Sequence, residues 1–234
     1  MADTLLEINI EKAGYDGNHS TIEQIKFAVK SGQLTGLIGP NGAGKSTTIK
    51  AIMGLLAEVK GTINFTKAGN HYAYIPEQPV YYETLTLWEH LSLASAVYGV
   101  NETVLEREGN ALLERFRMTD VKHHLPDGFS KGMRQKMMLM IGFLIRPDIY
   151  IVDEPFVGLD PRATRDFLEL LEEERHRGAG VLMCTHVLDT AERICDDFVL
   201  VSNGRIVVSG ELADIRRAAS LPEGTLFDCF NALT

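Results

Sequence analysis

The stretch LTGLIGPNGAGKST, residues 34–47, decides the fold of this chain. It begins as a short apolar strand, and the residues that follow from Lys45, KSTTIKAIMGLL, have the apolar spacing of a helix. Between the two lies GPNGAGKST, which fits the P-loop (Walker A) pattern GxxxxGK[ST] in the strand–loop–helix context that this pattern requires. We therefore expect the phosphates of a nucleotide to be bound by Gly39, Pro40, Asn41, Gly42, Ala43, Gly44, Lys45, Ser46 and Thr47.

Each part of this loop has a chemical task. The glycines let backbone N–H groups approach the phosphates without Cβ clashes. Lys45 supplies a positive charge for the β- and γ-phosphates, and the hydroxyl of Ser46 is a ligand for Mg²⁺.

The pattern of strands and helices around the loop indicates an α/β fold with a mostly parallel sheet. Residues 5–38 alternate as strands broken by turns, one of them YDGNHS, and we expect an N-terminal antiparallel β-subdomain there. FVLVSNGRIVVSG predicts a hairpin around Asn203–Gly204. Residues 161–178 predict a helix that Pro161 opens and Gly178 ends. Helical spacing dominates from Thr86 to Arg146 and predicts helices in LWEHLSLASAVYGV, in TVLEREGNALLERF at residues 103–116, and in MRQKMMLMIGFLI. We expect a discontinuous core of residues 1–85 and 146–210, an inserted helical subdomain at 86–145 and a tail at 211–234.

Composition narrows the class of protein. The chain has 234 residues, 45% of them hydrophobic, with a net charge of −9 and a pI near 5.3, which argues against charge-driven binding to nucleic acid or anionic lipid. Its N-terminus does not resemble a signal peptide, and its longest apolar run, Met137 to Ile145, is too short to cross a bilayer. The three cysteines include no CxxC and indicate reduced thiols in the cytosol. At a membrane, this chain would need another chain to bring it there.

A second candidate site element is IYIVDEP, an apolar strand that ends in two carboxylates. Asp153 at the end of an apolar strand is typical of the residue that holds Mg²⁺, usually through water, beside a P-loop. Glu154 follows directly, and a carboxylate there can polarise an attacking water. The alternative is that these are two solvated acids at a strand terminus.

A second glycine-rich turn precedes a helix in DGFSKGMRQKMMLM, residues 127–140. The free N–H groups of a helix N-terminus bind anions, so Ser130 and Gly132 are placed for another phosphate. In the simpler interpretation, Ser130 only caps the helix.

The order of these motifs resembles the ATPase subunits of ABC transporters from about residue 5 to residue 210. The resemblance rests on GPNGAGKST, YIPEQP, FSKGM, IYIVDEP, GLDP and CTH. It implies a RecA-like P-loop NTPase core, ATP and Mg²⁺ as cofactors, and a head-to-tail dimer that encloses two ATP molecules. The short chain with FSKGM, and a tail ending LFDCFNALT, is similar to bacterial single-domain ATPases of the Ecs-type exporter subgroup.

The resemblance explains why one chain has two phosphate-binding turns. FSKGM stands where this family has its signature, most often LSGGQ, which contacts the ATP of the opposite subunit. Ser130, Lys131 and Gly132 are therefore expected to bind ATP in trans. Lys131 and Met133 depart from the usual glycine and glutamine, which leaves the rate of turnover open.

Further positions follow from the resemblance one at a time. Tyr15 matches the aromatic residue that stacks on adenine, and Gln78 matches the glutamine that contacts Mg²⁺ or the lytic water. Asp160 matches the loop that links the two sites across the dimer. His186 matches the histidine that contacts the γ-phosphate and steadies Glu154, so Glu154, His186, Lys45 and Gln78 are the expected catalytic residues.

The expected function is ATP hydrolysis that drives a separate integral membrane permease subunit, with export as the direction. The ATPase would lie on the cytoplasmic face of the cell membrane, held there by its partner as a homodimer or ABC-type dimer, with no nucleic acid. The partner's contact would lie near Gln78, where Tyr81, Tyr82 and Trp88 are either docking residues or core. Two alternatives are a soluble ABC ATPase and a nucleotide-gated module with little hydrolysis.

Overall fold

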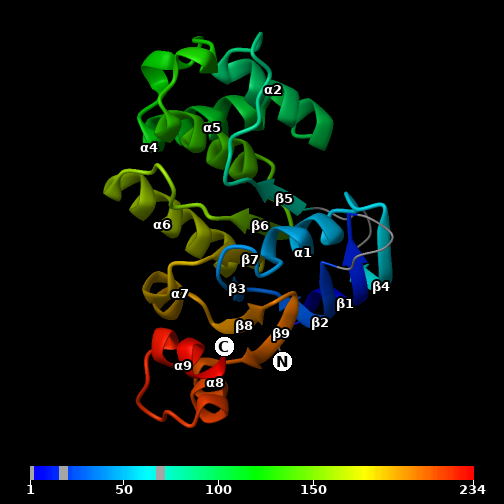
Figure 1. Ribbon diagram of the computed structural model, residues 1–234. Helices are drawn as coiled ribbons and strands as arrows, with labels where there is room; N and C mark the ends of the chain where they lie inside the picture. The colour runs from blue at the N-terminus through cyan, green and yellow to red at the C-terminus, as the bar shows by residue number, and fades with distance from the viewer. Residues whose placement is uncertain (1–2, 16–20, 67–71) are drawn as a thin grey trace.

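The computed structural model describes residues 3–15, 21–66 and 72–234, which form two sheets and several helices, with the sheet of β1, β2 and β4 at one edge (Figure 1). The turn expected in YDGNHS lies mostly outside these residues. The first sheet is antiparallel, in the order β2-β1-β4, and consists of β1 (Thr4–Gly14), β2 (Ile22–Lys30) and β4 (Glu58–Phe65). It confirms the expected N-terminal antiparallel subdomain.

The second sheet carries the P-loop, in the order β5-β6-β7-β3-β8-β9. Its strands are β3 (Leu34–Ile38), β5 (Tyr72–Ile75), β6 (Ile149–Asp153), β7 (Gly180–Thr185), β8 (Asp197–Ser202) and β9 (Arg205–Gly210). All neighbouring strands are parallel except β8 and β9, which form the expected hairpin. Asn203 and Gly204 have φ of 50° and 75°, as the tight hairpin turn requires. The central strands β3, β6 and β7 are buried along their whole length, because helices pack on one face, and the antiparallel sheet packs on the other together with Ile49 and Ile52.

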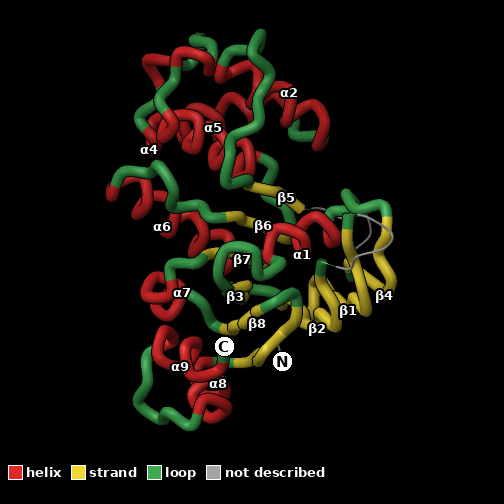
Figure 2. Tube along the Cα trace, viewed as in Figure 1, coloured by secondary structure: helices red, strands yellow, loops and turns green. Residues whose placement is uncertain are grey.

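Helices fall into three groups (Figures 1 and 2). The core carries α1 (Lys45–Ile52), α6 (Pro161–Arg177) and α7 (Leu188–Ile194). The inserted segment carries α2 (Leu87–Tyr98), α3 (Glu102–Val104), α4 (Asn110–Phe116) and α5 (Lys131–Leu144). The last described helices are α8 (Leu212–Ala219) and α9 (Leu226–Leu233), which pack through Ile215, Leu226 and Cys229 against apolar residues of β8 and α7, so the expected tail has regular structure.

Local sequence explains where these helices begin and end. In α6, Asp160 caps the first turn by accepting from the Ala163 amide at 2.8 Å, Pro161 is the first helical residue, and Gly178 ends the helix with φ of 100°. The helix α1 is shorter than the expected span of residues 45–56, because Gly54 turns the chain with φ of 71°.

The helix expected at residues 103–116 is not continuous. Residues Leu105–Gly109 form a π-helical turn between α3 and α4. A Cβ atom at Gly109 would lie 2.9 Å from Cζ3 of Trp88, so the absence of a side chain makes room for the indole. Lys122 covers that ring, with Nζ 3.4 Å from its centroid. The packing of this tryptophan accompanies the irregular turn.

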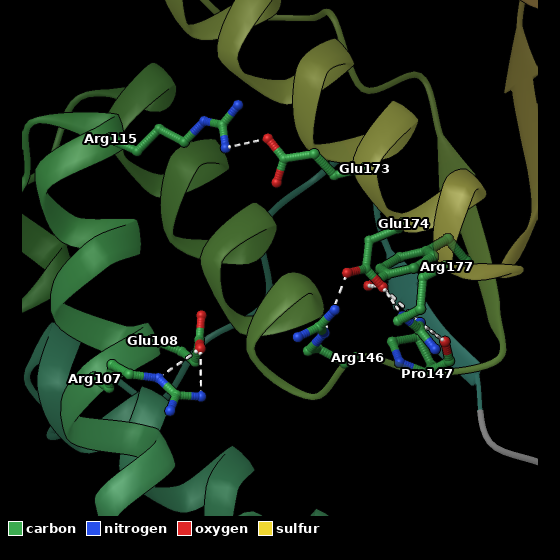
Figure 3. Close-up of polar contacts among 9 residues, drawn as sticks. Arg107, Glu108, Arg115, Arg146, Pro147, Glu173, Glu174 and Arg177 are labelled. Atoms are coloured by element: carbon green, nitrogen blue, oxygen red, sulfur yellow. Dashed lines mark hydrogen bonds and ion pairs between the residues drawn. The ribbon is translucent and has the colours of Figure 1, made fainter.

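Ion pairs join the helical segment to the core at α6 (Figure 3). Arg115 of α4 bonds Glu173 at 2.8 Å, and Arg146, just after α5, approaches Glu174 at 3.3 Å. Glu174 is buried and also accepts from Arg177 and from the hydroxyl of Tyr150. Two guanidinium groups and one hydroxyl therefore pair with this carboxylate, as a buried charge requires.

Two further features bear on the predictions from composition. Within the described residues, no helix combines the length and apolar character that crossing a membrane requires. Cys184, Cys195 and Cys229 are free thiols. Burial raises the pKa of Cys195 to about 12, so this thiol is protonated at neutral pH.

Candidate phosphate-binding site

The P-loop wraps around the side chain of its own lysine. Lys45 is 93% buried, and its Nζ donates to the carbonyl oxygens of Gly39 at 2.7 Å and Pro40 at 3.2 Å. Gly44 has φ of 106°, and a Cβ there would lie 2.6 Å from Cγ2 of Ile22. Only glycine fits this position, which sets the direction in which α1 leaves the loop.

A cavity of about 280 Å³ opens beside this loop. Residues from five separate parts of the chain line it: Thr21, Asn41, Gly42, Gly44, Lys45, Ser46, Thr47, Glu77, Asp153, Glu154 and His186. The sheet order brings these parts together, because β3 and β6 both lie next to β7 and all three run parallel. Their carboxyl ends meet at one edge, where ligands of open α/β sheets bind.

Asp153 is the most strongly perturbed acid in this cavity. Burial, followed by repulsion from Glu154 and Glu77, raises the pKa of its carboxyl to about 6. Lys45 and a hydrogen bond with Ser46 act in the opposite direction. Tyr74 also bonds this carboxylate, which together with burial raises the pKa of the phenol. A site that crowds carboxylates in this way is poised to gain from a cation.

Glu154 has an unusual backbone for a residue with a side chain. Its φ is 45°, in the left-handed region that costs a non-glycine residue about 1 kcal/mol or more. Two contacts hold it there: its amide donates to the Cys184 carbonyl at 2.9 Å, and its Oε1 lies 2.8 Å from Nδ1 of His186. This turn directs the carboxylate of Glu154 into the cavity. Glu154 is buried, whereas His186 is exposed at the rim.

The residues present suit MgATP. The helix α1 begins at Gly44 without a side-chain cap and without an acidic residue in its first turn, so its N-terminal N–H groups are available to an anion. In the described part of the chain, no cluster of three or more His, Cys, Asp or Glu side chains could hold a metal by itself. Mg²⁺ does not require such a cluster, because it commonly binds one carboxylate, here Asp153, a hydroxyl such as that of Ser46, and phosphate oxygens of the nucleotide.

The loop after β5 presents a different residue to the cavity from the one that the sequence predicts. Glu77 lines the cavity and repels Asp153, whereas Gln78 is exposed and is not among the described lining residues. The role of Gln78 toward Mg²⁺ or water stays a prediction. Glu77 could have been found, since it precedes Gln78 in the same short motif YIPEQP.

The signature turn does not reach this cavity within its own chain. Ser130 caps α5, accepting from the Met133 amide at 3.3 Å, and its role toward a second phosphate stays a prediction. The described lining residues include none of Ser130, Lys131, Gly132 and Asp160. The turn instead lies against the GLDP loop: a Cβ at Gly132 would lie 2.5 Å from the Gly158 carbonyl, and Lys136 pairs with Asp160 at 2.9 Å.

Tyr15 lies beside the helix that follows the P-loop. Its hydroxyl accepts from Lys50 Nζ at 3.2 Å, and 53% of the residue is exposed. Hydrogen bonds with Thr47 and Lys50 outweigh partial burial and lower the pKa of the phenol. The ring is therefore accessible next to the P-loop, and its stacking on adenine stays a prediction.

The three aromatic residues near Gln78 differ in exposure. Tyr82 is 62% exposed, whereas Tyr81 and Trp88 are partly buried and pack against the main core cluster. Besides Glu77, the sequence reasoning missed Thr21 in the cavity wall and Tyr74 beside Asp153. Thr21 belongs to no motif, and Tyr74 opens the motif YIPEQP without a role that the motif predicts; the packing of the chain brings both to the site.

Comparison with known proteins places these motifs in a wider group. The family model described as ABC transporter matches residues 22–157. The Bacillus subtilis (strain 168) protein YthP, an uncharacterized ABC transporter ATP-binding protein, is 50% identical over 97% of this chain and 95% of its own length. The ABC-type transporter ATP-binding protein EcsA of the same organism is 42% identical over 99% and 97%. A solved ATP-binding subunit of an ABC transporter is 45% identical, with a TM-score of 0.94 over 98% of this chain and 99% of that one.

Proposed function

The chain belongs to the family of ABC transporter ATP-binding proteins, and from this premise we propose that two copies close head to tail around two MgATP to drive a separate membrane permease. As a member, it is an ATPase that couples ATP hydrolysis to transport. The finer proposal has three parts: the composite sites, the chemistry within each site, and the membrane partner.

One observation supports the composite sites above all. Lys45, Asp153, Glu154 and His186 converge on one cavity, whereas the turn at Ser130 lies outside its described lining. A helix N-terminus of this kind favours anions, and a turn that is not among the described lining residues of its own chain's cavity fits a role toward the nucleotide of a second copy. The helix that Ser130 caps would then direct its N–H groups at that γ-phosphate.

The residues of the cavity divide the chemistry between them. Lys45 and the loop amides bind the β- and γ-phosphates, and Asp153 and Ser46 hold Mg²⁺, which offsets phosphate charge when it is bound. Because Glu154 Oε1 is occupied by His186, we assign Oε2 as the oxygen that polarises the attacking water. His186 must carry a hydrogen on Nδ1 for that bond, and its exposed ring faces the cavity from the rim.

Substitution of Glu154 by glutamine tests the chemistry and the dimer together. The amide cannot act as a base, so Glu154→Gln should bind ATP, lose at least 99% of turnover, and accumulate as an ATP-bound dimer in size measurements. His176→Gln is a matched control on an exposed residue of α6, and it should keep wild-type turnover. A monomeric Glu154→Gln variant with normal turnover would contradict both assignments.

The membrane partner and the direction of transport complete the proposal. Val80 and Tyr82 are exposed on the loop after Glu77, and they offer an apolar contact for a cytoplasmic segment of the permease. Export as the direction rests only on the resemblance of FSKGM and the tail LFDCFNALT to the Ecs-type exporter subgroup. Copurification with an integral membrane protein after mild detergent extraction tests this part, and recovery of the chain only in the fraction without membranes would count against it.

A further inference from the structure

One short loop connects the nucleotide cavity with an exposed apolar surface. The loop consists of residues 76–86. Its second residue, Glu77, lines the cavity, and two later residues, Val80 and Tyr82, are 77% and 62% exposed. We call Val80 and Tyr82 the docking pair. The shape of this loop therefore decides how the docking pair stands relative to the cavity.

Side chains from two helices contact the loop, and three of these contacts lie at residues 76–82. Gln135 of α5 donates to the Pro76 carbonyl at 3.2 Å, and the guanidinium of Arg134 lies 5.3 Å from the centre of the Tyr81 ring. From α2, the ring of His90 accepts a hydrogen bond from the Tyr82 amide, with Nε2 2.9 Å from that nitrogen. Of these three contacts, only the one from His90 reaches a member of the docking pair.

The partners of His90 define its chemical form. The ring is 95% buried, and its Nδ1 lies 2.8 Å from the Thr86 carbonyl, which can only accept. Nδ1 therefore carries the hydrogen. Nε2 is then a bare acceptor, as the Tyr82 amide requires, so the ring is neutral and uses both nitrogens.

The start of α2 does not depend on this ring. Thr86 and Glu89 form a complete capping box, in which the Glu89 amide donates to the Thr86 hydroxyl at 3.3 Å and Glu89 Oε2 accepts from the Thr86 amide at 2.7 Å. The helix is thus capped without His90. What His90 adds is the bond to the Tyr82 amide and the ring contact with Tyr82, at 6.2 Å between centroids.

We infer that His90 is a positioning residue, which holds the docking pair in the shape that receives a cytoplasmic segment of the membrane subunit. This inference rests on the proposed function. Two exposed acidic residues follow Tyr82 in the sequence, Glu83 directly and Glu89 in the first turn of α2, and the chain as a whole has a net charge of −9. The segment that fits therefore combines apolar and basic side chains. His90 lies outside the nucleotide cavity and acts only through the loop.

The first measurement is hydrogen exchange at the Tyr82 amide in the full-length chain. His90→Phe keeps the ring but removes the acceptor, so the amide should exchange about five- to tenfold faster than in the wild type. His90→Gln offers an amide oxygen near the position of Nε2 and should recover part of the protection, which also gives a second variant if His90→Phe folds poorly. His124→Phe, at an exposed histidine of the neighbouring loop, is the control and should leave the exchange rate unchanged.

The second measurement is ATPase activity with and without the membrane subunit, supplied as inverted membrane vesicles from cells that lack the native ATPase chain. The His90→Phe variant should keep the basal rate but lose about 90% of the stimulation by the vesicles, and His90→Gln should recover part of it. Unchanged exchange at Tyr82, or faster exchange with full stimulation, would overturn the inference. If the wild-type chain is itself not stimulated, the proposed permease partner fails and the docking role fails with it, even where the exchange result shows the bond.

Discussion

Replacement of Asp153 by asparagine should make the nucleotide-free protein more stable, because this carboxyl is held in an unfavourable place. Burial and the charges of Glu154 and Glu77 raise its pKa from 3.8 to about 6. A pKa raised in the folded state means that folding favours the protonated form. The contribution of this carboxyl to the free energy of unfolding is therefore fully present below about pH 4 and is lost as the pH rises through 6.

The size of the effect follows from the shift. A difference of about two pKa units corresponds to about 3 kcal/mol, and partial screening by solvent at the cavity mouth reduces this to about 2 kcal/mol. Asparagine has the shape of aspartate without the charge, so Asp153→Asn should escape the loss. At pH 8 the variant should gain about 2 kcal/mol in the free energy of unfolding, or about 4–8 °C in Tm, and at pH 4 the gain should vanish.

The assay is chemical and thermal unfolding at pH 4, 6 and 8 without nucleotide or magnesium, followed by the same series with MgATP. Asp160→Asn is the matched control with the opposite sign, because Lys136 and the Ala163 amide lower the pKa of Asp160. Asp160→Asn should therefore lose stability at pH 8 and approach the wild type as the pH falls. MgATP should stabilise the wild type more than ATP alone, and Asp153→Asn should lose that difference. A variant that is less stable at pH 8, or equally shifted at pH 4 and 8, would refute the reasoning.

Two further predictions test separate parts of the structure. In a magnesium titration, Glu77→Gln should change the Mg²⁺ concentration for half-maximal ATPase activity by about threefold or more. Gln78→Ala should change it less, because Glu77 is among the described lining residues of the cavity and Gln78 is not. The reverse order would restore the role predicted for Gln78. Gly109→Ala should destabilise the chain by about 1–2 kcal/mol and shift the fluorescence of Trp88, since the new methyl group would overlap the indole. Gly128→Ala is the control, because nothing lies within 4 Å of a Cβ there, and it should change neither stability nor fluorescence. Unaltered stability and emission in Gly109→Ala would show that the overlap is relieved at no cost.

The sequence predicts most of the core because each signal there is local. The P-loop needs glycine, lysine and serine at set spacings, the hairpin needs Asn203–Gly204, and α6 needs Asp160, Pro161 and Gly178 at its two ends. Each requirement can be checked within a few residues. These elements, together with the antiparallel N-terminal sheet and the helical insertion, agree with the structure.

Features that depend on distant contacts could not be predicted in the same way. The π-helical turn at Leu105–Gly109 accompanies the indole of Trp88, and helical spacing alone gives no sign of it. Glu77 and Gln78 are neighbours in one loop, so only the path of the backbone decides which of them faces the cavity. Tyr74 meets Asp153 because β5 lies beside β6, which is a property of the sheet order. The assignment of Ser130 to a second copy's ATP goes beyond what a single chain can display.

The central claim is that Ser130 acts on the ATP held by Lys45 of the other copy, and a mixed dimer tests it most directly. Ser130→Arg places bulk and charge at the signature turn, and Lys45→Ala removes the cation of the P-loop, so each variant alone should be inactive. In a mixed dimer with a trans arrangement, both lesions meet at one ATP and the other site is wild type. Mixing should therefore restore ATPase activity, up to roughly half of the wild-type rate if the two sites act independently. Absence of recovery would contradict the claim, provided that mixed dimers are shown to form and that a control dimer with one wild-type site is active.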